Sequence, residues 1–284
     1  MNTYPKIGAH ISAAGDIALA PVRANEAGLE CFQFFSRPPQ GGPAKPITGK
    51  LIKEFRANSE KFDLESYIHT PYYINLASAK NNIYFGSIKV IREELERGSL
   101  LGVKYIMAHL GSAKELGEKE GIKKVIDGIY QILKDYKGQT EFLIEMSAGA
   151  GAIIGDSFEE IANIVLSPKL KKYNIGICFD TCHGFASGYD LRSAETVAAT
   201  FKKFDKTLGI KRLKLIHAND CESEFGSHKD RHAHIGEGNI GLDGFKAIVA
   251  IAKKRKINLV LETPHDLKLQ QDIKILKNII QTKV

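Results

Sequence analysis

The chain has 284 residues and is 43% hydrophobic, so it can bury a large core, which argues against an intrinsically disordered protein. Its four cysteines form no C-x-x-C pair and no apolar run approaches about 18 residues, which excludes a disulfide scaffold and a membrane-spanning segment. The formal net charge of +7 mildly favours a polyanionic partner, and the segment Met1–Lys6 lacks a signal-peptide pattern, so we expect a cytoplasmic protein.

Short apolar runs and longer amphipathic stretches alternate along the chain. The apolar runs predict strands at Lys6–Ser12, Cys31–Ser36, Tyr67–Thr70, Val103–Leu110, Glu141–Met146, Ile175–Asp180, Arg212–Ala218 and Ile257–Thr263. Apolar residues at helical spacing predict helices at Ile83–Leu101, Ile122–Tyr136, Ser157–Leu166 and Leu267–Ile280. Ser157, with Glu160 three residues later, predicts a capping box at the start of the third of these helices.

Eight strands that alternate with helices indicate a parallel sheet, and eight is the strand number of a closed TIM (β/α)8 barrel. The length fits one such α/β domain, so we assign residues 1–284 to a single barrel. A doubly wound open sheet is the alternative, but no G-x-G-x-x-G sequence opens a helix after the first strand. The irregular segments Arg37–Thr48, Ser147–Asp156 and Asn219–Asn239 each follow a strand, which in a barrel places them at the C-terminal face, where active sites form.

Histidines and carboxylates stand at the ends of six consecutive predicted strands and in the loop after the seventh strand. In a parallel barrel all of these strand ends point to one mouth. Imidazole nitrogens and carboxylate oxygens are the ligand atoms that hold zinc and similar ions. The candidate ligands are His69, His109, Glu145, Asp180, His183, His217, Asp230, His232 and Glu262.

A single histidine or acidic residue at a strand end is more often a hydrogen-bonded structural residue than a metal ligand. Nine of them in one cavity are a different case, because buried charges are costly without partners. Four carboxylates and five imidazoles need cations, and nine donors suffice for two or three ions. This mixed donor set suits Zn²⁺, with Mn²⁺ or Fe²⁺ as alternatives. Because such ions activate water and neutralise phosphate charge, we expect hydrolysis of a phosphodiester.

Three long segments and two strand exits carry a resemblance to a known family. The segments are His69-Thr-Pro-Tyr72-Tyr-Ile-Asn75-Leu-Ala, Gly176-Ile-Cys-Phe-Asp180-Thr-Cys-His183-Gly-Phe-Ala-Ser-Gly-Tyr-Asp190, and Leu215-Ile-His217-Ala-Asn219-Asp220 followed by Asp230-Arg231-His232 and Gly236-Glu-Gly-Asn239. The exits are Gly8-Ala-His10-Ile-Ser12-Ala-Ala-Gly15 and Glu262-Thr-Pro264. Together they resemble the endonuclease IV family of apurinic/apyrimidinic endonucleases (AP endonuclease family 2), over nearly the whole chain.

The resemblance implies a TIM barrel with three zinc ions, and Mn²⁺ is an alternative at one site. It assigns His69, His109 and Glu145 to the first ion. Glu145, as the catalytic residue, would bridge to a second ion held with Asp180, His217 and Glu262, and the third ion would take His183, Asp230 and His232. It further implies a monomeric base excision repair enzyme that acts on double-stranded DNA. The enzyme would extrude an abasic nucleotide and cut on its 5′ side, leaving a 3′-hydroxyl and a 5′-deoxyribose phosphate.

DNA contacts are expected from loop residues, namely Arg37, Gln40, Tyr72, Asn75 and Arg231. The loop Ser36-Arg37-Pro38-Pro39-Gln40-Gly41-Gly42 departs from the family, which usually has Asn and Arg followed by Trp there, and this chain contains no Trp. We therefore expect either that Gln40 takes the wedge position or that the wedge is absent, and we expect the departure to affect DNA affinity or damage discrimination rather than the chemistry. Met146 stands where the family usually has Asn, so the hydrogen bonding around Glu145 should differ.

The remaining histidines are predicted to lie outside the ligand set. We expect His10 to support a ligand or contact phosphate, His228 and His265 to be solvated, and His234 not to bind metal. The run Lys253-Lys254-Arg255-Lys256 reads as a solvated helix end rather than a DNA-binding patch. Two other functions stay open. A sugar isomerase or epimerase on the same barrel would use one or two ions, and a non-catalytic nucleic-acid-binding module would need none.

Overall fold

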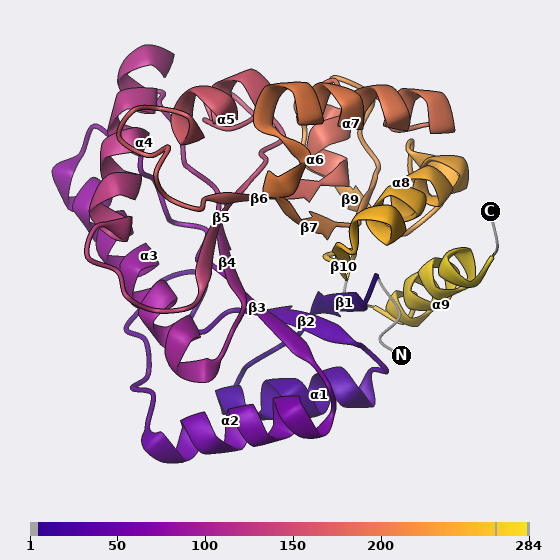
Figure 1. The fold of residues 1–284 in the computed structure, drawn as a ribbon, viewed down its shortest axis with the longest axis horizontal. Coiled ribbons are helices and arrows are strands. Elements are labelled where there is room, and N and C mark those ends of the chain that lie inside the picture. Colours follow the sequence, from indigo (N-terminus) through magenta and orange to yellow (C-terminus); the bar gives the residue numbers. More distant parts are fainter. Residues whose placement is uncertain (1–4, 265, 283–284) are drawn as a thin grey trace.

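Eight parallel strands close into a barrel in the computed structural model, which describes residues 5–264 and 266–282 (Figure 1). Around the barrel the strands follow the order β1, β10, β7, β6, β5, β4, β3, β2, and every neighbouring pair is parallel. Their bounds are β1 Ile7–His10, β2 Cys31–Phe34, β3 Glu65–His69, β4 Tyr105–Ala108, β5 Glu141–Glu145, β6 Gly176–Asp180, β7 Leu213–His217 and β10 Asn258–Leu261. The predicted TIM barrel is therefore confirmed and the open sheet is excluded; His265 lies outside the described residues.

Helices surround the barrel, as Figure 1 shows. They are α1 Ala20–Glu26, α2 Gly49–Lys61, α3 Asn81–Leu101, α4 Glu118–Leu133, α5 Phe158–Val165, α6 Thr181–Ala186, α7 Ala194–Leu208, α8 Gly241–Arg255 and α9 Leu269–Gln281. Four of them, α3, α4, α5 and α9, match the helices predicted from apolar spacing. Among the residues described, no helix has the length and apolar character needed to cross a membrane.

The start of α5 confirms half of the predicted capping box. The Ser157 hydroxyl accepts a hydrogen bond from the Glu160 backbone N–H, as expected for an N-cap (3.2 Å). The reciprocal bond is absent from this described segment, because the Glu160 carboxylate accepts instead from the backbone N–H of Gly155. Glu160 thus ties the loop before α5 to the helix rather than closing the box.

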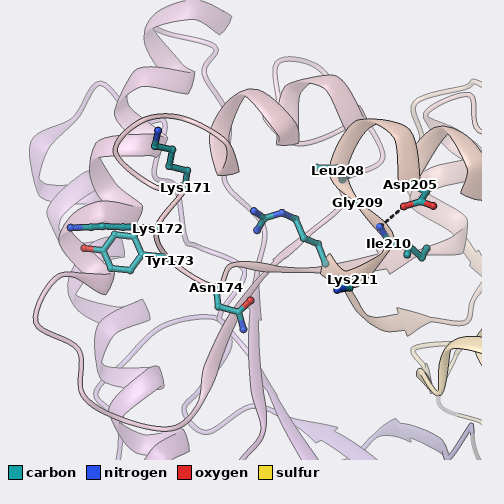
Figure 2. A pocket seen from close by; sticks show the side chains of 10 residues that line it. Lys171, Lys172, Tyr173, Asn174, Asp205, Leu208, Gly209, Ile210 and Lys211 are labelled. Atoms are coloured by element: carbon teal, nitrogen blue, oxygen red, sulfur yellow. Dashed lines mark hydrogen bonds between the residues drawn. The ribbon is translucent and has the colours of Figure 1, made fainter.

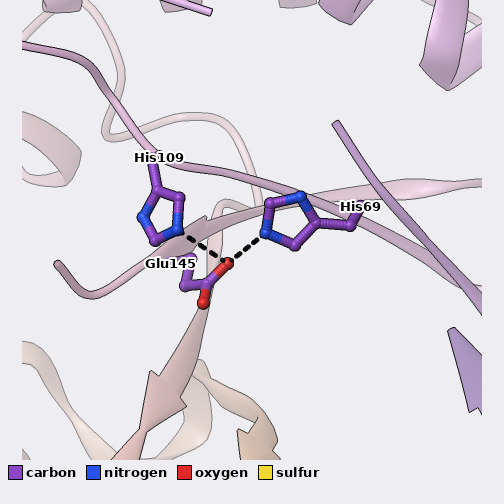
Figure 3. Close-up of side chains that lie close together, drawn as sticks. All are labelled: His69, His109 and Glu145. Atoms are coloured by element: carbon purple, nitrogen blue, oxygen red, sulfur yellow. Dashed lines mark hydrogen bonds and ion pairs between the residues drawn. The ribbon is translucent and has the colours of Figure 1, made fainter. Parts of the chain in front are cut away.

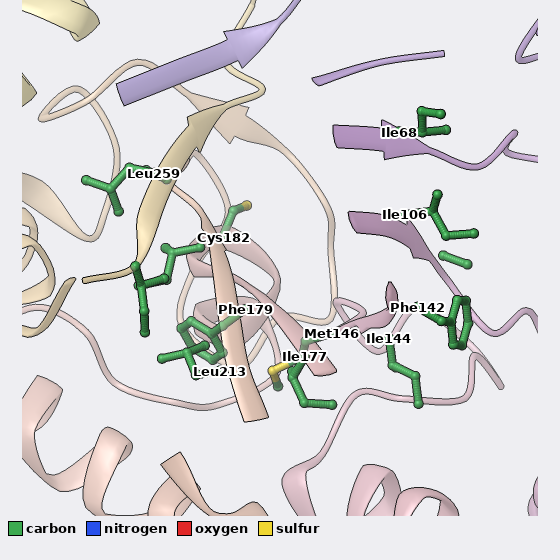
Figure 4. Packing of buried hydrophobic residues seen from close by; sticks show 14 of the residues in the cluster. Ile68, Ile106, Phe142, Ile144, Met146, Ile177, Phe179, Cys182, Leu213 and Leu259 are labelled. Carbon is green, nitrogen blue, oxygen red and sulfur yellow. The ribbon is translucent and has the colours of Figure 1, made fainter. Parts of the chain in front are cut away.

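Two apolar layers hold the barrel together. The larger layer lies between strands and helices and includes Ile68, Ile144 and Phe179 (Figure 4). Met146 packs in this layer too, so its side chain points away from the barrel interior. The smaller layer fills the barrel interior and consists of Cys31, Tyr67, Tyr105, Met107, Leu143, Cys178, Leu215 and Val260. We call this inner cluster the floor.

The loops at the C-terminal ends of the strands contain more regular structure than the sequence predicts. The segment Asn219–Asn239, predicted as irregular, forms a short antiparallel ribbon of β8 (Asp220–Cys221) and β9 (His232–Ala233). The helix α6, which the sequence did not predict, begins immediately after β6 and contains His183. The ribbon and α6 carry the third predicted ligand group, so both elements position side chains at the mouth of the barrel.

Candidate metal centre

Six of the nine candidate ligands occupy the layer directly above the floor. Successive side chains of a strand alternate between the two faces of the sheet, so a residue two positions after a floor residue points into the same interior, one layer higher. Six strands obey this rule, with Tyr67 below His69, Met107 below His109, Leu143 below Glu145, Cys178 below Asp180, Leu215 below His217 and Val260 below Glu262. The strand alternation therefore gathers imidazoles and carboxylates at one end of the barrel.

The first group joins His69, His109 and Glu145, whose ligand atoms lie within 4.8 Å of one another (Figure 3). The Nε2 atoms of His69 and His109 lie 2.8 Å and 3.6 Å from the same carboxylate oxygen, Oε2 of Glu145. His69 donates its Nδ1–H to the carbonyl oxygen of Thr70 (2.6 Å), which leaves the Nε2 lone pair toward the carboxylate. A lone pair facing a carboxylate needs a cation or a proton between them.

The second group shares Glu145 with the first and adds Asp180, His217 and Glu262. The Nδ1 atom of His217 lies 2.9 Å from Oε1 of Glu145, 3.1 Å from Oε2 of Glu262 and 3.8 Å from Oδ2 of Asp180. Glu145, Asp180 and His217 are all fully buried. Three carboxylates around one imidazole nitrogen in a buried site match the donor set of a divalent cation.

The third group consists of His183 on α6, His232 on β9 and Asp230 in the loop between β8 and β9. Each imidazole donates its Nδ1–H to a carbonyl oxygen, His183 to Met146 (2.8 Å) and His232 to Glu262 (3.0 Å). Both Nε2 atoms lie 3.2 Å from the Asp230 carboxylate, yet both are buried without a hydrogen-bond partner. Two buried nitrogens that face one carboxylate and bond to nothing fit a metal ion.

Local hydrogen bonds fix the carboxylate of Asp180 between the second group and the third. This residue ends β6 and is the N-cap of α6, where its Oδ1 accepts from the backbone N–H of His183 (2.8 Å). Its Oδ2 accepts from the side-chain NH₂ group of Asn219 (2.6 Å), and the side-chain Oδ1 of Asn219 accepts from the backbone N–H of Glu262 (2.7 Å). The sequence Asp180-Thr-Cys-His183 therefore places two ligands by the geometry of a helix start.

Electrostatic interactions in the site shift the pKa values of its members. Burial opposes ionisation of Glu145, but the surrounding imidazoles, with His109 the strongest, hold the pKa of this carboxyl well below its usual range. Burial also opposes protonation of His183, but the carboxylates of Asp180 and Asp230 outweigh it and raise the pKa of this imidazole to about 10. The carboxylates thus stabilise positive charge beside the imidazole nitrogens, and a divalent cation would supply that charge.

The three groups open into one cavity of about 350 Å³ at the mouth of the barrel. Side chains of the first and third groups line it, and Tyr72 stands at its edge with 69% of its surface exposed. The Tyr72 ring also contacts Phe35, with 5.3 Å between ring centroids. The cavity is therefore open to solvent on the loop side and closed below by the floor.

A second cleft, of about 600 Å³, lies among the loops that lead into β6 and β7, at the opposite end of the strands (Figure 2). Lys171, Lys172, Lys211 and Arg212 line it, together with Tyr173. No candidate ligand lies in this cleft among the described residues.

The loop residues predicted to contact DNA differ in their exposure. Tyr72, Gln40 and Arg231 are exposed on loops of the C-terminal face. Asn75 is half-buried and donates from its side-chain amide to the carbonyl oxygen of Ser112 (3.2 Å).

Arg37, also predicted to contact DNA, is 4% exposed and forms ion pairs with Glu93 (3.0 Å) and the fully buried Glu94 of α3. Its guanidinium therefore points to α3 rather than to the mouth.

His10, His228 and His234 belong to none of the candidate ligand groups. His228 is exposed in the loop after β8, and His234 is a buried residue whose Nδ1 contacts the Asp272 carboxylate (2.7 Å). His10 lies beside the ligand layer, with its Nδ1 3.1 Å from the Gln33 side-chain nitrogen. Residues Lys253–Lys256 stand at the C-terminal end of α8, away from the mouth.

Gln33 is the site residue that sequence reasoning missed. It lies on β2, two positions above the floor residue Cys31, and is fully buried among the ligands. The signal was present as a single polar residue inside the apolar run Cys31-Phe32-Gln33-Phe34. A search restricted to histidine and carboxylate passes over an amide, because an amide is a weak ligand for zinc.

Known proteins are similar to this chain over most of its length. Residues 21–279 match a family model described as a xylose isomerase-like TIM barrel. A protein of Nitrosopumilus maritimus (strain SCM1) named probable endonuclease 4 is 39% identical over 264 residues, which are 92% of this chain and 94% of that protein.

Two solved structures share the fold. The crystal structure of endonuclease IV from Thermus thermophilus matches with a TM-score of 0.86 and 29% identity, covering 98% of this chain and 99% of that one. A D-tagatose 3-epimerase-like protein matches with a TM-score of 0.72 and 20% identity, covering 97% of each chain. The second likeness concerns the fold alone.

Proposed function

Because this chain belongs to the endonuclease IV family of DNA repair nucleases, we propose that it is a zinc-dependent endonuclease that hydrolyses the phosphodiester 5′ to an abasic site in double-stranded DNA. The products would be a 3′-hydroxyl and a 5′-deoxyribose phosphate. The observation that carries the proposal is the convergence of nine donor residues in three groups at one mouth, with Glu145 shared by two of the groups.

The proposed ligand sets follow the three groups. His69, His109 and Glu145 would hold one zinc ion, and His183, Asp230 and His232 another. The remaining group would hold an ion jointly with Glu145, and Mn²⁺ is admissible at one of the three positions. Bound divalent ions supply water activation and neutralise negative charge on phosphodiester oxygens.

The residues of the chain would position the substrate around these groups. An abasic nucleotide has no base to unstack, so its extrusion into the cavity costs less than flipping a paired base. We propose that the exposed Tyr72, Gln40 and Arg231 contact the DNA. Arg37 and Asn75, which bond to α3 and to Ser112, would hold the loops that present those contacts. The enzyme would act as a monomer, in the cytoplasm with the genome.

A nicking assay tests the proposal directly. A labelled duplex with one abasic analogue should be cut on the 5′ side of the analogue, while the same duplex with an intact base should not. Removal of metal by a chelator should abolish cutting, and added Zn²⁺ should restore it. Cutting that survives complete metal removal, or an abasic duplex left intact by the zinc-loaded protein, would refute the assignment. A measured content of one or two ions with no nicking would favour the sugar epimerase alternative.

A further inference from the structure

The amide of Gln33 takes part in the ligand layer although it is neither a histidine nor a carboxylate. The side chain is fully buried on β2, at the height of the ligands and above the floor residue Cys31. A buried amide presents one acceptor oxygen and two N–H donors, and leaving them unbonded would cost free energy. The partners of those atoms therefore indicate the role of the residue.

All of these partners belong to the site or border it. The Oε1 atom of Gln33 accepts from Nε2–H of His217 (2.8 Å), and its Nε2 donates to Oε1 of Glu262 (2.6 Å). The same Nε2 lies 3.1 Å from Nδ1 of His10. The two ligand contacts use both hydrogen-bonding functions of the amide. One ligand donates a hydrogen bond to the amide oxygen, and the other accepts one from the amide nitrogen.

We propose that Gln33 is a positioning residue for the second metal site, an inference that rests on the proposed metal-dependent function. By accepting from Nε2–H, the amide keeps the His217 proton on that nitrogen and leaves the Nδ1 lone pair for the ion. By donating to Oε1, it leaves Oε2 of Glu262 facing the same point, 3.1 Å from Nδ1 of His217. One side chain thus fixes the tautomer of one ligand and the orientation of another.

The shape and polarity of an amide are specific to this task. A carboxylate in its place would still accept from His217 but would repel the Glu262 carboxylate at hydrogen-bond distance. A methionine would fill a similar volume but would bond to neither ligand. Gln33→Glu and Gln33→Met therefore separate the two bonds, and they do so without opening a large cavity in the barrel.

The alternative is that Gln33 is a buried amide that only contributes to stability, and a matched control distinguishes the two. Asn258 is a second buried amide in the same barrel, whose side chain donates to the Tyr67 hydroxyl (2.7 Å) and contacts no candidate ligand. Asn258→Leu should lower the melting temperature without changing zinc affinity. Gln33→Met should change zinc affinity in addition to any effect on stability.

The experiment measures zinc affinity by competition with a chromophoric chelator in the full-length protein. For Gln33→Met we expect one of the three ions to bind about 10- to 100-fold more weakly, the usual cost of losing a partner of a metal-bound histidine, while the other two are unchanged. For Gln33→Glu we expect a smaller loss at the same ion. If Gln33→Met fails to fold, the Gln33→Glu result decides, and unchanged affinity there would overturn the inference.

A spectroscopic readout reports the bond to His217 itself. In zinc-loaded protein labelled with ¹⁵N-histidine, the proton on Nε2 of His217 should be shifted downfield and should exchange slowly with water in the wild type and in Gln33→Glu, because residue 33 accepts a hydrogen bond from it. In Gln33→Met, which offers no such acceptor, this signal should move upfield or be lost to exchange. Wild-type affinity together with an unchanged His217 signature in Gln33→Met would sink the inference alone. A wild-type chain that binds no divalent ion would sink the proposed function and this inference together.

Discussion

Replacement of Glu145 by glutamine should remove two ions at once. The Glu145 carboxylate is the member common to the first and second groups, and it faces His69 Nε2 at 2.8 Å and His217 Nδ1 at 2.9 Å. Gln keeps the volume but replaces one anionic oxygen by an NH₂ group, which cannot bind a cation. The zinc content should therefore fall from about three to about one per chain, since of the three groups proposed to hold zinc the third lacks Glu145.

The size of the effect follows from mass action. At a zinc concentration of 100 times the Kd, each bound ion stabilises the folded state by about 2.7 kcal/mol. Losing two ions removes about 5 kcal/mol, and each kcal/mol corresponds to about 2–4 °C in a domain of this size. The rise in Tm that zinc produces should therefore be smaller in Glu145→Gln than in the wild type by about 10–20 °C.

Elemental analysis after dialysis and thermal unfolding with and without zinc measure both quantities. His232→Ala serves as the matched variant, because His232 belongs to the third group with His183 and Asp230, and its loss should cost about one ion. Glu145→Gln protein that keeps all its zinc, or that loses no more than His232→Ala does, would refute the shared-ligand assignment. Loss of zinc without any change in the zinc-dependent rise of Tm would refute the energetic reasoning.

Three further substitutions test other parts of the structure. Arg37→Met removes the nearer of two cations that pair with the buried Glu94 carboxylate and leaves only Arg97, at 3.8 Å. Urea unfolding should therefore show a loss of up to about 3–5 kcal/mol, and the double variant with Glu94→Leu should recover part of it; an Arg37→Met variant of unchanged stability would contradict the buried pair. Tyr72→Ala should leave Tm unchanged, because the ring is 69% exposed, but should weaken binding to abasic duplex by the 1–3 kcal/mol typical of a stacked base, or about 5- to 150-fold in a fluorescence titration. Equal affinity of this variant would exclude stacking at Tyr72. Gly8→Ala adds a Cβ that collides with the carbonyl oxygen and Sγ of Cys31 on the neighbouring strand. The free energy of unfolding, measured in the same urea experiment, should therefore fall by about 1–3 kcal/mol or more. A variant of unchanged stability would mean that β1 and β2 can separate.

The barrel and its ligand layer were predictable because both depend on short-range sequence order. A buried strand such as Gly176–Asp180 reads as an apolar run whatever its neighbours are, and a parallel barrel brings all strand ends to one face. The strand ends were therefore located to within a few residues, and the nine donors were found without coordinates. The resemblance to a family added a division of these donors among three ions, which stays a prediction.

Features that depend on contacts between distant residues were not predictable from the chain alone. From the sequence, Arg37 was expected to be a loop cation that contacts DNA. In the structure its side chain is buried against Glu94, which lies 57 positions later on α3. The ribbon of β8 and β9 arises from pairing of Cys221 with His232 across a loop that shows no strand pattern. The role proposed for Gln33 depends on its contact with His217, which lies 184 residues later in the chain. No local sequence pattern reveals that contact.

Because of the apolar floor, the interior of the barrel is open to solvent only at the loop side. Cys31, Tyr67 and Leu215 are among its members, and none of the eight is more than 8% exposed, so neither water nor ions can pass through the lower end. A partner bound over the loop side would therefore control the exchange of water and ions between the cavity and the solvent. If the proposed metal ions and DNA bind here, a duplex across the opening would retain the ions for the lifetime of the complex, and a chelator would remove them only after the DNA dissociates.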